Sequence, residues 1–197
     1  TSTLGPDVEV SDLNNDGLDD IILSQAKGKA SQMFYQSKDG GFTENKKVKF
    51  AKDTNNEDTR SLVFDINNDN KKDVFLLSCS SELSQESSGI KDRLYIQKEN
   101  DAFELYDKNF GISKFQNSGA IDDFDFDNDG DLDIIIAERL KASQFGVPCN
   151  AYVLRNDGDQ GFKNITKENA PGLLGQGMYS DIKFSDINND THIDIVY

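Results

Sequence analysis

Apolar runs of strand length recur along the chain, and each one follows a short acidic segment. Four of these runs are rich in β-branched and aromatic residues, and they occupy residues 21–23, 74–77, 134–136 and 195–197. Runs of this length and composition are typical of buried strands rather than helices. Shorter alternating segments precede the acidic ones, at residues 8–10, 62–64, 121–124 and 182–184. The pattern predicts that each acidic segment joins two strands, as the connection of a hairpin.

A second pair of strands is expected in each of the first three repeats. An aromatic or aliphatic strand is followed by a polar turn and then by Phe42, Phe103 or Phe162. The turns occupy residues 38–41, 99–102 and 156–161. Gly, Asn and Asp in these turns supply the positive φ angles that hairpins require. Each full repeat is therefore predicted to contain four strands, which fits one blade of a β-propeller.

The predicted fold class is all-β, a single partial β-propeller that spans residues 1–197. About 3.5 four-stranded blades are expected; they lie at residues 7–55, 60–110, 118–170 and 178–197, and the last is incomplete. An exposed apolar edge strand would invite aggregation. The chain is therefore expected to belong to a ring of about seven or eight blades, completed by further blades or by a partner chain. The polar connections 78–90 and 139–149 are expected to be surface loops.

The acidic segments are four copies of one nine-residue loop. They begin at Asp12, Asp65, Asp125 and Asp186, so successive starts are 53, 60 and 61 residues apart. Carboxylate or amide oxygens at positions 1, 3, 5 and 9 can fold inward around one hard cation, and position 7 would lend its main-chain carbonyl. Ca²⁺ takes six to eight oxygens at about 2.3–2.6 Å. The sequence therefore predicts up to four structural Ca²⁺ ions.

The predicted ligands occupy positions 1, 3, 5, 7 and 9 of each loop. In loops one and two they are Asp12, Asn14, Asp16, Leu18 and Asp20, then Asp65, Asn67, Asp69, Lys71 and Asp73. In loops three and four they are Asp125, Asp127, Asp129, Asp131 and Asp133, then Asp186, Asn188, Asp190, His192 and Asp194.

The four loops are not expected to bind equally. Loop three has four ligand carboxylates and should bind most tightly. Loop two has Asn70 at the sixth position, which tolerates the left-handed region, but Lys71 and Lys72 oppose a cation. Loop four has Thr191 at that position, and a β-branched residue suits positive φ poorly. We therefore expect loop four to be the weakest site.

An EF-hand is the obvious rival for these loops, and the sequence disfavours it. An EF-hand needs a bidentate Glu at position 12 and flanking helices. Position 12 is apolar in all four loops and lies in a predicted strand; the residues are Leu23, Leu76, Ile136 and Tyr197. The aspartate at position 9 must close the site instead.

The loop pattern Asp-x-Asn/Asp-x-Asp-Gly-x-x-Asp, followed by Ile and Val, resembles the FG-GAP and VCBS repeats. Such repeats occur in integrin α-subunit propellers and in many secreted bacterial proteins. Residues 152–166 are also similar to the neighbouring strands of VCBS and cartilage-acidic-protein-like repeats. The resemblance covers essentially the whole chain. It implies a Ca²⁺-stabilised propeller in an extracellular or cell-surface setting, and it does not imply one function.

The composition disfavours some classes of binding partner. The net charge is −15, from 36 acidic and 21 basic residues, which argues against nucleic acid and against insertion into or binding to an anionic membrane. No apolar run approaches the roughly 20 residues of a membrane span. Cys79 and Cys149 are the only cysteines. They could form one disulfide or be two small buried residues, and the sequence does not choose between these readings.

No catalytic constellation is recognisable in the sequence. The only histidine, His192, occupies a loop position where its carbonyl would serve, so its ring is expected to be solvated. Motifs for a serine nucleophile, a zinc site or a phosphate cradle are missing. The first hypothesis is a non-enzymatic scaffold for protein or glycan binding and adhesion. The second is a propeller domain of a carbohydrate-active enzyme (polysaccharide lyase-like) or a lectin, and the third is a structural module of a surface assembly.

Overall fold

The computed structural model describes residues 5–48, 50, 53–108, 110–113, 116–142, 144 and 146–197. The first sheet contains β1 (Val8–Ser11), β2 (Asp20–Leu23), β3 (Gln32–Gln36) and β4 (Phe42–Glu44). The second contains β5 (Asp58–Phe64), β6 (Asp73–Ser78), β7 (Arg93–Gln97) and β8 (Phe103–Leu105). The third contains β9 (Ser118–Phe124), β10 (Asp133–Glu138), β11 (Ala151–Asn156) and β12 (Phe162–Asn164). The fourth contains only β13 (Lys183–Ser185) and β14 (Asp194–Val196).

Strands are hydrogen-bonded in chain order within each sheet, and every pairing is antiparallel. Helices are short: η2 (Ser88–Ile90), η3 (Glu99–Asp101), η4 (Gly158–Gln160), α1 (Thr166–Asn169) and η5 (Pro171–Leu173). None of the helices in the described residues is long and apolar enough to cross a membrane. The all-β prediction and the four-stranded repeats are therefore confirmed, and the fourth repeat consists of its first two strands.

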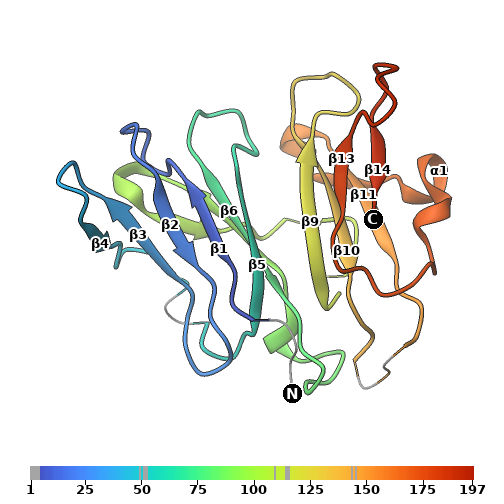
Figure 1. Ribbon diagram of the computed structural model, residues 1–197, viewed down its shortest axis with the longest axis horizontal. Helices are drawn as coiled ribbons and strands as arrows, with labels where there is room; N and C mark the ends of the chain where they lie inside the picture. The colour runs from blue at the N-terminus through green and yellow to red at the C-terminus, as the bar shows by residue number, and fades with distance from the viewer. Residues whose placement is uncertain are drawn as a thin grey trace.

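Each acidic loop joins two paired strands, as predicted. The residue before loop position 1 pairs with the aspartate at position 9, so the aspartate is also the first residue of the second strand. The closing pairs are Ser11–Asp20, Phe64–Asp73, Phe124–Asp133 and Ser185–Asp194. All four loops lie at the same end of the molecule, at the top in Figure 1.

The hydrophobic core consists of three layers between neighbouring sheets. All six residues of β6 and all six of β10 are buried, because each of these strands has a sheet packed on both of its faces. Ile134 and Ile136 of β10 contact the layer toward sheet two, whereas Ile135 and Ala137 contact the layer toward sheet four. This alternation follows from the period of two along a strand. The uninterrupted apolar runs in the sequence are therefore strands buried on both faces.

The first strands of the sheets lie next to one another. Strand β1 contacts β5, β5 contacts β9, and β9 contacts β13, so the four sheets follow one another side by side (Figure 1). Polar groups join these strands: Asp122 of β9 pairs with Lys183 Nζ at 2.5 Å and accepts from the Phe184 N–H at 2.8 Å. Asp122 thus links sheet three to sheet four.

The two cysteines are both buried and both free. Cys149 lies in the layer between sheets three and four, and its N–H donates to the Gly177 carbonyl at 2.8 Å. Burial raises the pKa of the Cys79 thiol to about 12. Of the two readings left open by the sequence, the structure supports two small buried residues.

Asp92 is a buried carboxyl that connects sheets two and three. Its oxygens accept from the Ser78 N–H at 3.0 Å and from the Ser118 hydroxyl at 2.6 Å. Burial raises the pKa of Asp92 to about 7, against an ordinary value of 3.8. Between about pH 4 and pH 7, the carboxyl is therefore protonated in the folded protein and ionised in the unfolded chain. Its contribution lowers the free energy of unfolding as the pH rises through this range.

Replacing Asp92 with asparagine is expected to stabilise the protein, and more at about pH 8 than at about pH 5. An asparagine keeps an oxygen for the Ser78 N–H, and the Ser118 hydroxyl can turn to accept from the amide. Thermal melts of the variant and the parent at both pH values measure this difference. Asp107→Asn, at an exposed position, is the control and should show no such trend. A melting difference for Asp92→Asn that is independent of pH would contradict the assignment.

Candidate metal centres

The first residue of each loop holds the turn together in the same way in all four copies. Its carboxylate accepts from the N–H groups of positions 5 and 6. In loop three, Asp125 accepts from Asp129 at 3.1 Å and from Gly130 at 3.0 Å. The corresponding distances are 3.1 and 2.9 Å in loop one, 3.1 and 2.7 Å in loop two, and 3.1 and 2.9 Å in loop four. The repeated sequence therefore folds into a repeated geometry.

The fifth residue continues this pattern. One of its carboxylate oxygens accepts from the N–H of position 7, at 2.9 Å in loop one, 3.0 Å in loop two, 2.9 Å in loop three and 2.8 Å in loop four. In loops one, two and four, the asparagine at position 3 also accepts from the N–H of position 5. Backbone donors of the loop itself thus hold the side chains of positions 1 and 5 in all four loops, and that of position 3 in loops one, two and four.

The aspartate at position 9 ties its loop to the third strand of the sheet. One oxygen of Asp133 accepts from the Phe126 N–H at 3.1 Å, and the other accepts from the Asn156 N–H at 2.8 Å. Asp20 and Asp73 make the same two contacts in their own sheets, and all three are fully buried. The Asp194 side chain is half-buried and, among the described residues, accepts from the Ile187 N–H alone.

Burial of these carboxyls affects their protonation. Burial raises the pKa of Asp73 to about 6 and that of Asp133 to about 7, even though the two N–H donors act in the opposite direction. The carboxylates of Asp127 and Asp129 add to the rise at Asp133. Negative charge is therefore concentrated at loop three, and the Arg155 guanidinium, which pairs directly with Asp157, balances it only in part.

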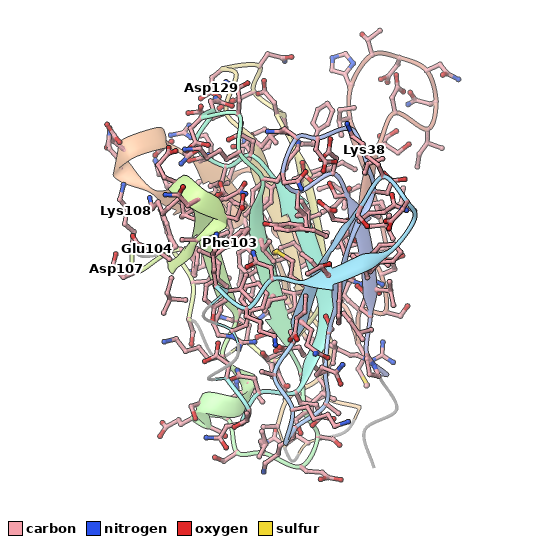
Figure 2. The ribbon with its side chains drawn as sticks, turned by 90° about the vertical axis from the view of Figure 1, so that its left-hand side faces the viewer. Lys38, Phe103, Glu104, Asp107, Lys108 and Asp129 are labelled. Carbon is pink, nitrogen blue, oxygen red and sulfur yellow. The ribbon has the colours of Figure 1, made fainter. Side chains whose placement is uncertain are left out.

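Three carboxylates converge at loop three. Ligand oxygens of Asp125, Asp127 and Asp133 all lie within 4.8 Å of one another. Two oxygens at about 2.3–2.6 Å from one Ca²⁺ can be at most about 5 Å apart, so this donor set fits a calcium ion. Asp129, the predicted ligand at position 5, lies outside this group, and so does the Asp131 side chain. Figure 2 shows Asp129 near the end of the molecule that carries the loops.

The predicted turn at position 6 has a positive φ in every loop. The angles are 84° for Gly17, 63° for Asn70, 94° for Gly130 and 72° for Thr191. Thr191 adopts this conformation although it is β-branched, which fits the expectation that loop four is the least favourable of the four.

Position 4 is a second left-handed residue, which the sequence reasoning overlooked. It is asparagine in each loop, and its φ lies between 55° and 60° in Asn15, Asn68, Asn128 and Asn189. Asparagine is one of the few residues that tolerate this region. The same residue type at the same place in four loops was the signal that could have identified it.

Two of the position 4 asparagines, Asn15 and Asn68, also join neighbouring loops. Asn15 Nδ2 donates to the Asn70 carbonyl of loop two at 2.7 Å. Asn68 Nδ2 donates to the Gly130 carbonyl of loop three at 2.9 Å and to Asp131 Oδ1 at 2.8 Å. Each of these carbonyls belongs to position 6 of the next loop. The candidate metal loops are therefore linked across the boundary between sheets.

Replacing Asn68 with glycine is expected to lower the free energy of unfolding by about 1 kcal/mol more than the same change at Asn189. Glycine retains the positive φ, but it removes the amide that bridges two loops, and a net hydrogen bond is worth about 0.5–1.5 kcal/mol. Asn189 has the same φ, and no loop follows loop four in the structure. Urea denaturation of both variants makes the comparison. Equal losses would show that the bridge adds nothing.

Two side chains raised questions in the sequence, and the His192 ring lies beside its own loop, with Nδ1 3.2 Å from Asp190 Oδ1. Lys71 Nζ pairs with Glu99 at 2.6 Å, in the turn between β7 and β8, so its charge has a partner outside loop two. The His192 side chain is 86 % exposed, as expected for a solvated ring.

Comparison with known proteins adds one finding. A family model described as an FG-GAP-like repeat matches residues 12–76, 65–136 and 125–197. Each match begins at the first residue of a loop and extends beyond the start of the next loop. A comparison with curated protein sequences gives no match.

Proposed function

Because the chain belongs to the FG-GAP-like repeat family, we propose that it is an extracellular, calcium-binding β-propeller scaffold for protein or glycan binding. The observation that carries the proposal is the repeated loop geometry, with three carboxylates converging at loop three. A bound Ca²⁺ would supply positive charge at the point where these groups repel one another. Four ions would carry eight positive charges against a net charge of −15.

The ligands in this proposal are those of positions 1, 3, 5, 7 and 9. At loop three, Asp125, Asp127 and Asp133 would hold the ion directly, and Asp129 and the Asp131 carbonyl would complete the shell. The role is structural rather than catalytic: the ion fixes the loop, and the loop fixes the hairpin. Millimolar extracellular calcium suits such sites, since extracellular modules bind with Kd values of about 10⁻⁴–10⁻³ M.

Apolar residues exposed on the two outermost sheets support the proposal that further blades pack against them. Phe103 begins β8 and is fully buried between sheets one and two, whereas Phe42 begins β4 and is 46 % exposed. At position 2 of the loops, Leu13 and Ile66 are buried against the following sheet, whereas Ile187 is 61 % exposed. The two outer faces thus carry the same apolar residues that are buried between neighbouring sheets inside the molecule. Further blades packed there would complete a ring of about seven or eight.

Isothermal titration with Ca²⁺ tests the proposal, and Mg²⁺ serves as the comparison ion. Ca²⁺ should bind at up to four sites, and Mg²⁺ should bind more weakly because it demands near-ideal octahedral geometry at about 2.0–2.1 Å. Asp127→Asn should remove the tightest site, whereas the exposed Asp107→Asn should leave the titration unchanged. A titration without heat, or one in which Asp127→Asn behaves like the parent, would refute the calcium assignment.

A further inference from the structure

A cavity with several polar side chains in its wall lies at the end of the molecule opposite the acidic loops. Its volume is about 510 Å³, which is within the range of about 300–1,000 Å³ found for small-molecule sites. It is lined by Gln85 of the β6–β7 connection, Gln116 before β9, Glu138 and Tyr152, and Gln144 of the β10–β11 connection. These connections lie at the lower end of sheets two and three (Figure 1). The cavity is therefore separated from the candidate metal loops by the length of the strands.

Glu138 is the central group of this cavity. It is the last residue of β10, at the opposite end of the strand from Asp133, and only 2 % of its side chain is exposed. Its Oε2 accepts from Lys141 Nζ and, at 2.9 Å, from the Asn150 N–H. No hydrogen bond joins Oε1 to another described residue. Oε1 is not among the fully buried atoms that lack a partner, so it is open to the cavity and can accept a hydrogen bond from a ligand.

The remaining polar groups both donate and accept. Gln116 and Gln144 contribute carboxamides, and Gln116 is only 7 % exposed. The oxygen of the third carboxamide, Gln85, already accepts from the Ala142 N–H at 3.2 Å. The Tyr152 hydroxyl accepts from Asn150 Nδ2 at 2.9 Å, which leaves its own hydrogen to donate. The half-buried Tyr152 ring adds an aromatic surface to the wall. No net charge is presented to a ligand, because Lys141 already pairs with Glu138.

We infer that this cavity binds a neutral saccharide residue. Sugar hydroxyls donate and accept at once, so they match carboxamides, a phenol and a carboxylate oxygen with a free acceptor position. The aromatic ring suits the apolar face of a pyranose. An anionic ligand is disfavoured, because the chain carries a net charge of −15. The inference rests on the glycan-binding part of the proposed function, and it places that binding away from the metal loops.

Saturation-transfer NMR with glucose, galactose and mannose, in calcium-containing buffer, tests the inference on the whole chain. At least one of these sugars should receive saturation from the protein. Glu138→Gln should weaken binding at least tenfold, because it replaces the carboxylate oxygen that lacks a donor. Gln144 is exposed, so Gln144→Ala should weaken binding several-fold without changing the melting temperature. Gln160→Ala is the matched control, because this exposed glutamine belongs to η4 rather than to the cavity lining.

The outcomes separate this inference from the calcium assignment. No transfer to any of the three sugars, or unchanged affinity in both Glu138→Gln and Gln144→Ala, would overturn it. Preferential binding of an alkylammonium probe over the sugars would also overturn it, by showing that the cavity recognises a cation. Asp129→Asn lies at the other end of the molecule and should leave sugar binding intact. Sugar binding by a parent protein that binds no Ca²⁺ would count against the calcium assignment alone.

Discussion

Removal of Ca²⁺ by a chelator is expected to lower the melting temperature by about 5–11 °C for each site that is emptied. A ligand at a hundredfold excess over its Kd stabilises the native state by about 2.7 kcal/mol. In a domain of this size, 1 kcal/mol shifts the melting temperature by about 2–4 °C. The buried carboxyls at position 9 of loops one to three make the loss larger, since they repel their neighbours once the cation has gone.

Differential scanning calorimetry with EGTA and with excess Ca²⁺ measures this shift. Addition of Ca²⁺ after chelation should restore the original melting temperature, and Mg²⁺ should restore it only in part. Identical melting curves under both conditions would mean that the loops are stable hairpins without a cation. The hydrogen bonds made by positions 1, 5 and 9 within each loop would then be sufficient to hold its conformation.

The second large effect is expected at Asp133, which acts as more than a metal ligand. Asp133→Ala should destabilise the protein by about 2–4 kcal/mol even in the presence of chelator. The substitution leaves two N–H groups without an acceptor, those of Phe126 and Asn156, and an unsatisfied buried donor costs about 1–3 kcal/mol. Asp129→Ala should cost under about 1 kcal/mol in the same buffer, since this exposed residue loses one bond at the surface.

Urea denaturation at about pH 6 makes this comparison cleanest. Because burial raises the pKa of Asp133 to about 7, its metal-free side chain is mainly neutral at pH 6. The alanine variant then gains little from removal of a buried charge, so the cost of the two unsatisfied N–H groups is measured directly. In excess Ca²⁺, both variants should lose the stabilisation provided by loop three. If Asp133→Ala and Asp129→Ala were equally stable in EGTA, Asp133 would have no structural role beyond the metal.

The sequence was sufficient to predict the strands and the loops, because both depend on local patterns. The run Ile134–Ile136 reads as a strand buried on both faces, and β10 is such a strand. The second contact of Asp133 could not be read in this way, since its partner Asn156 lies 23 residues away on β11. The same holds for the link from Asp122 to sheet four, which spans 61 residues.

Other structural features could not be predicted from the sequence pattern, for different physical reasons. Strand β5 begins at Asp58 and carries a register irregularity between Asp58 and Arg60, and a bulge of this kind has no simple hydrophobic signature. The position 4 asparagines were visible as a repeated residue, but their link to the next loop needs the sheets side by side. The cavity at Glu138 forms between two connections that show no common motif.

Anomalous diffraction from crystals grown with millimolar Ca²⁺ tests the central claim most directly. The account predicts a calcium peak at loop three, with carboxylate oxygens of Asp125, Asp127 and Asp133 at about 2.3–2.6 Å. Weaker peaks should follow at the other loops, the weakest at loop four. Density at these loops that shows water alone, or a calcium peak away from all four of them, would contradict the account.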